Sequence, residues 1–225
     1  MRCREGDGED AAKAGRPSVI LPGLPSKVVQ ICASKDLDLV VASTASNQVY
    51  LFNLRDGRFV QVIDCTQRVE SPWQEEGKTV KANYRITQLL TTWMGYVVIS
   101  MISVRRGLPN YLLCFDVNGI LLYERHDVAK IHTLSASHDS KWLFAESTHH
   151  ICIFTLPDLR LNTVLASPKL KIESLCVSSD NRALLAGVEN GDVFCYGLNL
   201  RWKEKEDEMP VEAEEEMMEG NEELD

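Results

Sequence analysis

The sequence predicts an all-β protein built from about four similar sheets of four strands each, on three observations. Its apolar residues come in short runs of four to eight, separated by turn-forming residues, as is typical of strands. No window sustains the apolar stripe at a period of 3.6 that marks an amphipathic helix. One order of runs and turns recurs along the chain, which indicates internal repeats.

The repeat is clearest in two segments that lie 144 residues apart. Residues 33–52 have the sequence ASKDLDLVVASTASNQVYLF, and residues 177–196 have VSSDNRALLAGVENGDVFCY. They align without a gap, and the alignment places Asp36 on Asp180. A matched order of apolar run, turn, apolar run, turn and aromatic-ended strand is therefore taken as a repeat.

Two further copies lie between these segments. Residues 133–155, TLSASHDSKWLFAESTHHICIFT, place Asp139 at the position of Asp36 and Asp180, with one residue fewer in a turn. Residues 85–125 form a looser copy, with the longer turn SVRRGLPN between its second and third strands. Each copy predicts one four-stranded antiparallel sheet. The clearest fourth strands are expected at Arg58–Ile63, Ile120–Glu124 and Leu161–Leu165.

These sheets are expected to stack as the blades of a partial β-propeller. Successive later copies start about 41 to 46 residues apart, which is the length of a propeller blade. Their inner strands, such as LDLVVAS and RALLAG, are apolar on both sides, so each sheet needs neighbours to bury both faces. The step from the first copy to the second is longer. It contains the polar segment 65–83, which we interpret as an inserted loop.

The blades are expected within residues 25–202, between two disordered segments at 1–24 and 203–225. The C-terminal segment is strongly acidic: residues 204–225 hold twelve Asp or Glu and one Lys, a net −11. The other 203 residues therefore carry +2 of the total charge of −9. With no aromatic residue, this tail cannot bury enough apolar area to offset the cost of chain ordering.

The chain resembles WD-repeat proteins in the order of Ser-x-Asp, apolar run, NGDV and aromatic residue between Ser178 and Phe194. The Trp-Asp dipeptide and the Gly-His signature are absent, and pairs such as Phe115-Asp116 stand in place of the dipeptide. Residues 28–202 are more specifically similar to the C-terminal WD-repeat region of BEACH proteins of the neurobeachin group. The matching segments are FDVNGILLYERHD, LSASHDSKWLFAES and LCVSSDNRALLAGVENGDVFCYGLNLRW.

No catalytic, cofactor-binding or metal-binding residue is assigned. His149 and His150 are adjacent in an expected turn, and neighbours in a strand point to opposite faces, which disfavours a shared metal. Asp36, Asp139 and Asp180 recur once per sheet, as expected of turn-formers that accept backbone N–H bonds. No G-x-S-x-G, Walker or GxGxxG motif occurs, and the pair at 105–106, Arg-Arg, is interpreted as an exposed loop tip.

The cysteines and tryptophans are expected to be structural. The seven Cys residues form no C-x-x-C pair, and most lie in apolar runs, so we expect buried, reduced thiols in a cytosolic protein. Trp93 and Trp142 are expected to pack between blades, and Trp202 to close the last blade.

These features favour a non-catalytic scaffold that binds proteins through propeller loops. The resemblance implies a role in vesicle or membrane trafficking as part of a BEACH-type protein. The alternatives are a WD-repeat scaffold in a nuclear or RNA-associated complex and, less favoured, a propeller-based hydrolase. A cytoplasmic location is expected, with no transmembrane segment and membrane contact only through a larger complex. No nucleic-acid partner is expected, because the chain lacks concentrated Lys and Arg.

Overall fold

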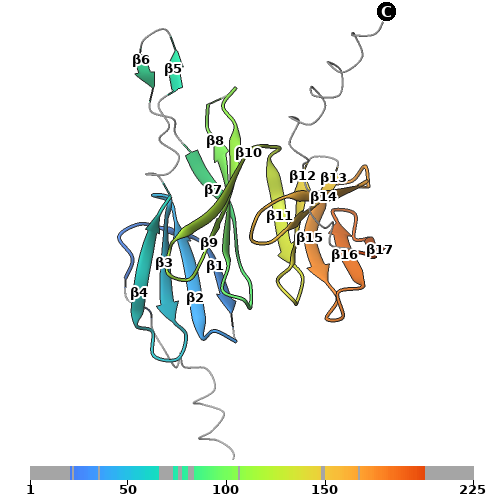
Figure 1. The fold of residues 1–225 in the computed structure, drawn as a ribbon, viewed down its shortest axis with the longest axis horizontal. Coiled ribbons are helices and arrows are strands. Elements are labelled where there is room, and N and C mark those ends of the chain that lie inside the picture. The colour runs from blue at the N-terminus through green and yellow to red at the C-terminus, as the bar shows by residue number, and fades with distance from the viewer. Residues whose placement is uncertain are drawn as a thin grey trace, which may run out of the picture.

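The computed structural model describes residues 21, 23–34, 36–65, 73–75, 78–80, 84–105, 107–147, 150–166 and 168–200. Within these residues the chain forms strands and no helix, so nothing there is a helix long and apolar enough to cross a membrane. The strands make four antiparallel sheets and one small hairpin (Figure 1). The all-β prediction is confirmed, and the succession of sheets is that of a partial β-propeller.

Each sheet is a simple meander in which strands adjacent in sequence pair with each other. Sheet 1 contains β1 (Val28–Ser34), β2 (Leu39–Thr44), β3 (Gln48–Asn53) and β4 (Phe59–Asp64). Sheet 2 contains β7 (Tyr84–Thr91), β8 (Val97–Ser103), β9 (Asn110–Phe115) and β10 (Leu121–Val128). Sheet 3 contains β11 (Ile131–Ala136), β12 (Trp142–Ser147), β13 (His150–Thr155) and β14 (Leu161–Ala166). Sheet 4 contains β15 (Ile172–Val177), β16 (Ala183–Val188) and β17 (Val193–Gly197).

Sheets 1 to 3 confirm the expectation of four strands per blade, and in sheet 4 three of the four expected strands lie among the described residues. By the 144-residue repeat, the counterpart of β4 would fall at 203–208, which lies outside the described residues, so a fourth strand in sheet 4 stays a prediction. The insertion at 65–83 contains a short hairpin of β5 (Trp73–Glu75) and β6 (Lys78–Val80). Residues 1–20 and 201–225 lie outside the described part, so the disorder expected there, and the position of Trp202, stay predictions.

A repeated irregularity supports the repeat at the level of the backbone. The first strand of each sheet pairs with the second strand through a register shift near its start. Such a shift marks a β-bulge or related irregularity, which bends a strand and increases its twist. The four shifts lie between Val28 and Gln30, Ile86 and Gln88, Ile131 and Thr133, and Ile172 and Ser174.

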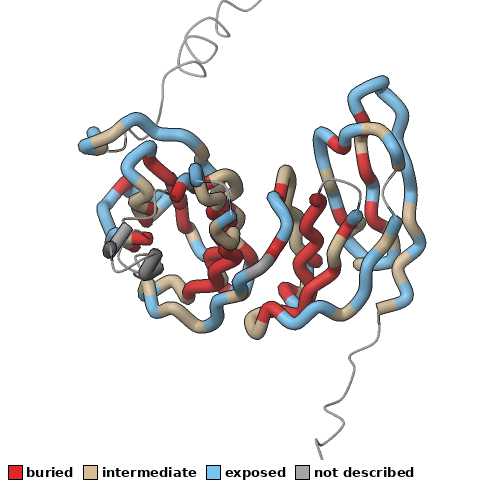
Figure 2. The backbone as a smooth tube through the Cα atoms, turned by 90° about the horizontal axis from the view of Figure 1, so that it is seen from above, coloured by how far each residue is buried: buried red, intermediate tan, exposed pale blue. Residues whose placement is uncertain are grey.

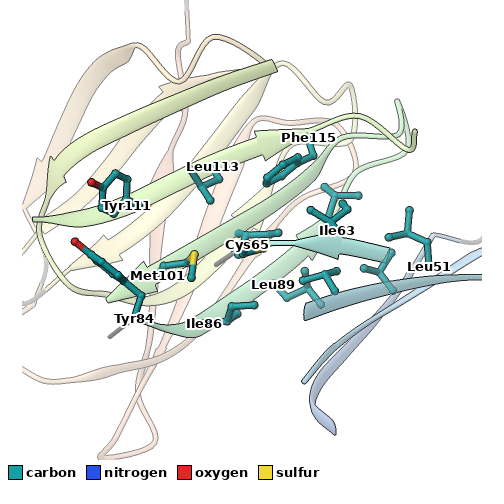
Figure 3. Close-up of a cluster of buried hydrophobic side chains, with 14 of the residues drawn as sticks. Leu51, Ile63, Cys65, Tyr84, Ile86, Leu89, Met101, Tyr111, Leu113 and Phe115 are labelled. Carbon is teal, nitrogen blue, oxygen red and sulfur yellow. The ribbon is translucent and has the colours of Figure 1, made fainter. Parts of the chain in front are cut away.

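The sheets stack face to face through three apolar junctions, with the first strands β1, β7, β11 and β15 side by side. Burial is concentrated on strands inside the stack, as Figure 2 shows. In the junction between sheets 1 and 2, shown in Figure 3, Leu51 and Ile63 face Leu89 and Phe115. Removing such side chains from water is the main force that holds blades together.

The other two junctions have the same construction. Between sheets 2 and 3, Val98 and Leu112 pack with Leu143 and Phe154. In the junction between sheets 3 and 4, sheet 3 contributes Trp142, Phe144, Ile151 and Ile153. Sheet 4 contributes Ile172, Leu184, Ala186 and Val188. The prediction that sheets apolar on both sides must be covered by neighbours is therefore confirmed for these three junctions.

Candidate interaction surface

The turns that follow the first strand of each sheet gather at one end of the stack, which we call the turn end. These turns lie between β1 and β2, β7 and β8, β11 and β12, and β15 and β16, along the lower side of Figure 1. Each contains one residue in the left-handed region of φ: Gly95 (88°), Ser140 (55°) and Asn181 (59°) at one shared position, and Asp38 (48°) one residue later in its turn. The turn end thus uses one turn type in sheets 2, 3 and 4, and a related turn in sheet 1.

A Ser-x-Asp motif fixes two of these turns. The Ser137 hydroxyl donates to the Asp139 carboxylate (2.6 Å) and accepts from the Trp142 backbone N–H (3.0 Å). Ser178 makes the same two bonds, to Asp180 (2.6 Å) and from the N–H of Ala183 (2.9 Å). Both carboxylates also accept backbone N–H groups, as expected of turn-formers. The Ser178 hydrogen bond lowers the pKa of Asp180 below its ordinary value.

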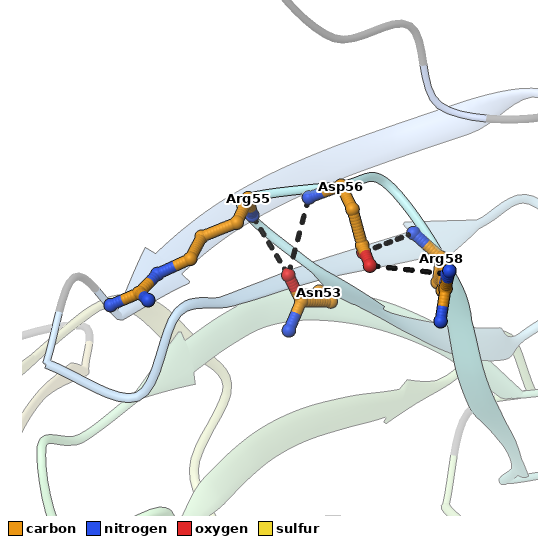
Figure 4. Close-up of polar contacts among 4 residues, drawn as sticks. All are labelled: Asn53, Arg55, Asp56 and Arg58. Carbon is orange, nitrogen blue, oxygen red and sulfur yellow. Dashed lines mark hydrogen bonds and ion pairs between the residues drawn. The ribbon is translucent and has the colours of Figure 1, made fainter.

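The turns after the third strands are closed by side chains as well. The Asn53 side-chain oxygen accepts the backbone N–H groups of Arg55 (2.8 Å) and Asp56 (3.3 Å). Asp56 in turn accepts the Arg58 N–H at 3.0 Å and forms an ion pair with the Arg58 side chain at 3.2 Å (Figure 4). Asp116 closes the equivalent turn of sheet 2 by accepting the N–H groups at 118 and 120. Local polar contacts therefore set these loops without help from a ligand.

Hydrogen bonds between turns lock neighbouring sheets to one another at this end. The Met94 N–H donates to the Ser140 hydroxyl (3.3 Å), which joins sheets 2 and 3. The His138 N–H donates to the Asn181 side-chain oxygen (2.8 Å), which joins sheets 3 and 4. Gln61 donates to the Val117 carbonyl (3.3 Å) and joins sheets 1 and 2. A surface fixed in this way loses little conformational entropy when a partner binds.

A hollow of about 260 Å³ opens among the turns of the first three sheets. Small and hydroxyl-bearing residues at the ends of β1, β7 and β11 form most of its wall, together with Trp93, Asp36 and His138. It is lined by Ala33, Ser34, Asp36, Leu90, Thr91, Thr92, Trp93, Ser135, Ala136, Ser137 and His138. The wall offers hydroxyl groups and one aromatic face, which suits a peptide or side chain of a partner protein.

Apolar side chains are exposed beside this hollow. Trp93 is 51% exposed, and Met94 and Leu37 are also exposed. A Cβ placed on Gly95 would come within 3.0 Å of Val117 and 3.4 Å of Leu37, so this close-packed turn requires glycine. Aromatic residues and methionine are enriched at protein interfaces, where they supply large contact areas. We refer to Leu37, Trp93 and Met94 as the apolar rim.

The rim corrects one expectation about the tryptophans. Trp142 is buried between sheets 3 and 4, as predicted. Trp93 was expected to pack between blades but lies in the turn after β7 and points partly into solvent. The sequence carried a signal for this, because the run TTWMG ends in a turn glycine directly after the strand.

The thiols are all unpaired among the described residues, and two of them are not buried as expected. Burial raises the pKa of Cys32, Cys65 and Cys114 to about 12, which leaves these thiols protonated and unreactive. Cys176 and Cys195 are exposed, because they lie on the face of sheet 4 that no other sheet covers. The expectation of burial is therefore wrong for Cys176 and Cys195, which lie on a face that no described sheet covers.

The remaining candidates do not converge on one site. His150 is exposed at the start of β13, and His149 lies outside the described residues. Arg105 is exposed in the loop after β8, while residue 106 lies outside the described part. In the described ranges no three His, Cys, Asp or Glu side chains are grouped as a metal site would require. A second, smaller hollow of about 130 Å³ lies between sheets 2 and 3, with Arg125 above the Phe154 ring.

Comparison with solved structures identifies the fold. The computationally designed Ika4 protein matches with a TM-score of 0.57 and 15% identity, over 82% of this chain and 99% of that chain. The designed Ika8 protein matches with a TM-score of 0.55 and 15% identity, over 80% of this chain and 48% of the other. KlAtg21, in its complex with the coiled coil of AgAtg16, matches with a TM-score of 0.59 and 15% identity, over 79% and 54%.

KlAtg21 is a β-propeller, so the likeness supports a propeller-type fold for this chain. The chain spans about half the length of Ika8 and of KlAtg21. No family model and no curated protein matches the sequence.

Proposed function

We propose that this chain is a non-catalytic scaffold that binds proteins at the turn end of its sheets. The observation that carries this proposal is the apolar rim on a rigid frame. Trp93 and Met94 stay exposed although their turn is held to the next sheet through Ser140. Aromatic side chains are enriched among the residues that contribute most to binding energy. A side chain on a rigid turn also loses little entropy when a partner binds.

We further propose that the scaffold serves vesicle or membrane trafficking, as the WD-repeat part of a BEACH-type protein. The sequence resemblance over residues 28–202 supports this assignment. KlAtg21 was solved with a coiled-coil partner, and that fact supports a protein-binding role for a fold of this kind. Rigid sheets that present variable loops suit such a role.

The test compares the wild-type chain with Trp93→Asp in affinity capture from cell lysate, read by quantitative mass spectrometry. We expect a set of proteins of the vesicle-trafficking machinery to bind the wild type and to be lost with the variant. Tyr123→Asp is the matched control, because Tyr123 is equally exposed but lies on β10, away from the rim. Equal capture by wild type and Trp93→Asp would overturn the assignment of the site. Capture of nuclear or RNA-bound proteins would favour the alternative complex.

A propeller-based hydrolase is the second candidate, since Asp36 and His138 both line the hollow. A carboxylate and an imidazole in one hollow are groups that general acid–base catalysis can use. Purified wild-type protein would then hydrolyse ester or phosphate test substrates, and His138→Ala would abolish the activity. A rate equal in both proteins would exclude this role for His138.

A further inference from the structure

The two ends of the stack expose opposite faces of a sheet. In each of the three junctions, a sheet packs one face against the sheet that follows it in the sequence. We call the face that contacts the following sheet the trailing face, and the face that contacts the preceding sheet the leading face. Sheet 1 therefore has a leading face with no sheet in front of it, and sheet 4 has a trailing face with none behind it, among the described residues. One chain thus offers one face of each kind.

The trailing face of sheet 4 is equivalent to surfaces that are fully buried elsewhere. Cross-strand pairs at the centre of the trailing faces are Val41–Leu51 in sheet 1, Val98–Cys114 in sheet 2 and Phe144–Ile153 in sheet 3. All six side chains are completely buried. The same pair in sheet 4 is Leu185–Cys195, with Cys176 on the other side of Leu185. Here Leu185 is 39% exposed, and both thiols are exposed.

The leading face of sheet 1 is apolar and rich in aromatic rings. Phe52 occupies the position of Phe115 and Phe154, which pack against the preceding sheet in sheets 2 and 3. Phe52 is itself almost fully buried, and the rings of Tyr50 (6.5 Å between centroids) and Phe59 (6.0 Å) lie against it within its own sheet. On the same face, Ile31 is 63% exposed, and Phe59 and Val62 are also exposed.

The two free faces differ in the size of their side chains, and the residues that form them are uncharged. The sheet 1 face carries the bulky residues Ile31, Tyr50, Phe52, Phe59 and Val62 around the smaller Ala33, Val40 and Ala42. The sheet 4 face carries smaller residues: Ser174, Cys176, Leu185, Gly187, Val193 and Cys195. Neither set contains a charged side chain, so the two faces can meet without burying an unpaired charge. Large residues packed on small ones fill space well, as in a protein core.

We propose that two copies of this chain associate head to tail, with the sheet 4 face of each copy on the sheet 1 face of the other. The contact continues the trailing-on-leading packing that already holds the chain together three times. Because it joins different surfaces, it is heterologous, and a two-fold axis closes it into a ring of eight sheets. This association goes beyond the proposed function and does not depend on it.

The experiment measures the mass of the full-length chain by sedimentation equilibrium over a concentration series. We expect a reversible dimer of twice the 25.3 kDa chain mass. Ile31→Asp removes the sheet 1 face and Leu185→Asp the sheet 4 face, and each is expected to raise the dissociation constant at least about 100-fold, because each variant places a charge in both contacts. Val104→Asp is the matched control: Val104 is 61% exposed, close to the value for Ile31, but lies in the loop after β8. It should leave the dimer unchanged.

Mixing the two variants tests the head-to-tail geometry. The Leu185→Asp copy keeps an intact sheet 1 face, and the Ile31→Asp copy keeps an intact sheet 4 face. The mixture should therefore form a dimer through one unaltered contact, although neither variant dimerises alone. A Leu185→Asp protein that dimerises as well as the wild type would overturn the proposal, since its contact would not use sheet 4.

Cysteine labelling gives an independent readout and a check on folding. Cys176 and Cys195 should react with a maleimide in dilute protein and be protected at concentrations that favour the dimer. Cys65 should stay unreactive throughout if the protein is folded. A wild-type chain that stays monomeric with both thiols reactive at every concentration would overturn the proposal. Val193→Asp, on the same face as Leu185, repeats the test if Leu185→Asp fails to fold.

Discussion

At the residue scale, the turns depend on a few hydroxyl and carboxylate groups that satisfy backbone N–H groups. Ser137 is buried and serves both the Asp139 carboxylate and the N–H of Trp142. Ser178 has the same partners in sheet 4 but is only partly buried. Leaving a buried N–H unpaired is more costly than losing an exposed hydrogen bond.

Ser137→Ala is therefore expected to lower the free energy of unfolding by about 1 to 3 kcal/mol, because it removes the buried hydroxyl that accepts the Trp142 N–H. Denaturant unfolding followed by tryptophan fluorescence measures this loss. Ser179→Ala, at an exposed position in the equivalent turn of sheet 4, should change stability by less than about 0.5 kcal/mol. Equal losses of stability from the two substitutions would show that the hydrogen bond from Trp142 to Ser137 does not stabilise the fold.

Glu146 is an acidic group buried in β12, and burial raises the pKa of its carboxyl, with neighbouring Lys171 acting in the opposite direction. A raised pKa in the folded state means that the unfolded chain ionises first as pH increases. Stability from this group is thus complete below the ordinary carboxyl pKa and is lost as pH rises through the raised value. Glu146→Gln should have a flatter stability curve from acid to neutral pH. Melting temperatures of both proteins across that range measure the difference, and parallel curves would contradict the burial effect.

At the element scale, the burial of a strand depends on whether a neighbouring sheet covers its face. Strand β12 is buried at every position, and its Phe144 reaches the junction with sheet 4. Strand β4 lies at the outer edge of sheet 1, and its Phe59 is 53% exposed. The same residue type is thus found inside a junction and on a free face.

Phe144→Ala is expected to reduce the free energy of unfolding by about 3 to 5 kcal/mol, because it removes a fully buried ring and leaves a cavity. Phe59→Ala, the matched substitution on the free face, should cost much less in dilute monomer. Urea unfolding monitored by circular dichroism compares the two. A comparable loss at Phe59 would mean that the free face is covered in the monomer.

Most of the element pattern could be predicted from the sequence. The three expected fourth strands agree with β4, β10 and β14 to within a few residues. The positions of Asp139 and Asp180 in equivalent turns also followed from the repeat, because local hydrogen bonding determines such turns. The fourth strand expected in the last copy would follow β17 beyond the described residues, so that part of the pattern stays a prediction.

At the scale of the whole molecule, charge is separated from the folded body. Residues 204–225 carry a net −11, and the rest of the chain carries +2. The sequence predicts that this tail does not pack on the sheets, because it has too little apolar surface to offset ordering.

Deleting residues 204–225 should therefore leave the free energy of unfolding in urea unchanged, within about 0.5 kcal/mol. The truncated protein should also bind an anion-exchange resin far more weakly, because its net charge changes sign. Unfolding of the full-length and truncated chains under one buffer gives the comparison. A clear loss of stability on truncation would show that the tail packs against the body.

The sequence by itself determined the strands, the turns between them, the repeat and the need of each sheet for neighbours. These features are local, because they depend on alternation, turn chemistry and spacing along the chain. Only the tertiary structure decided that Trp93 stands exposed beside a hollow and that Cys176 and Cys195 face solvent. An apolar run does not reveal whether another sheet covers it, because that depends on which segments distant in the chain pack together and where the stack ends.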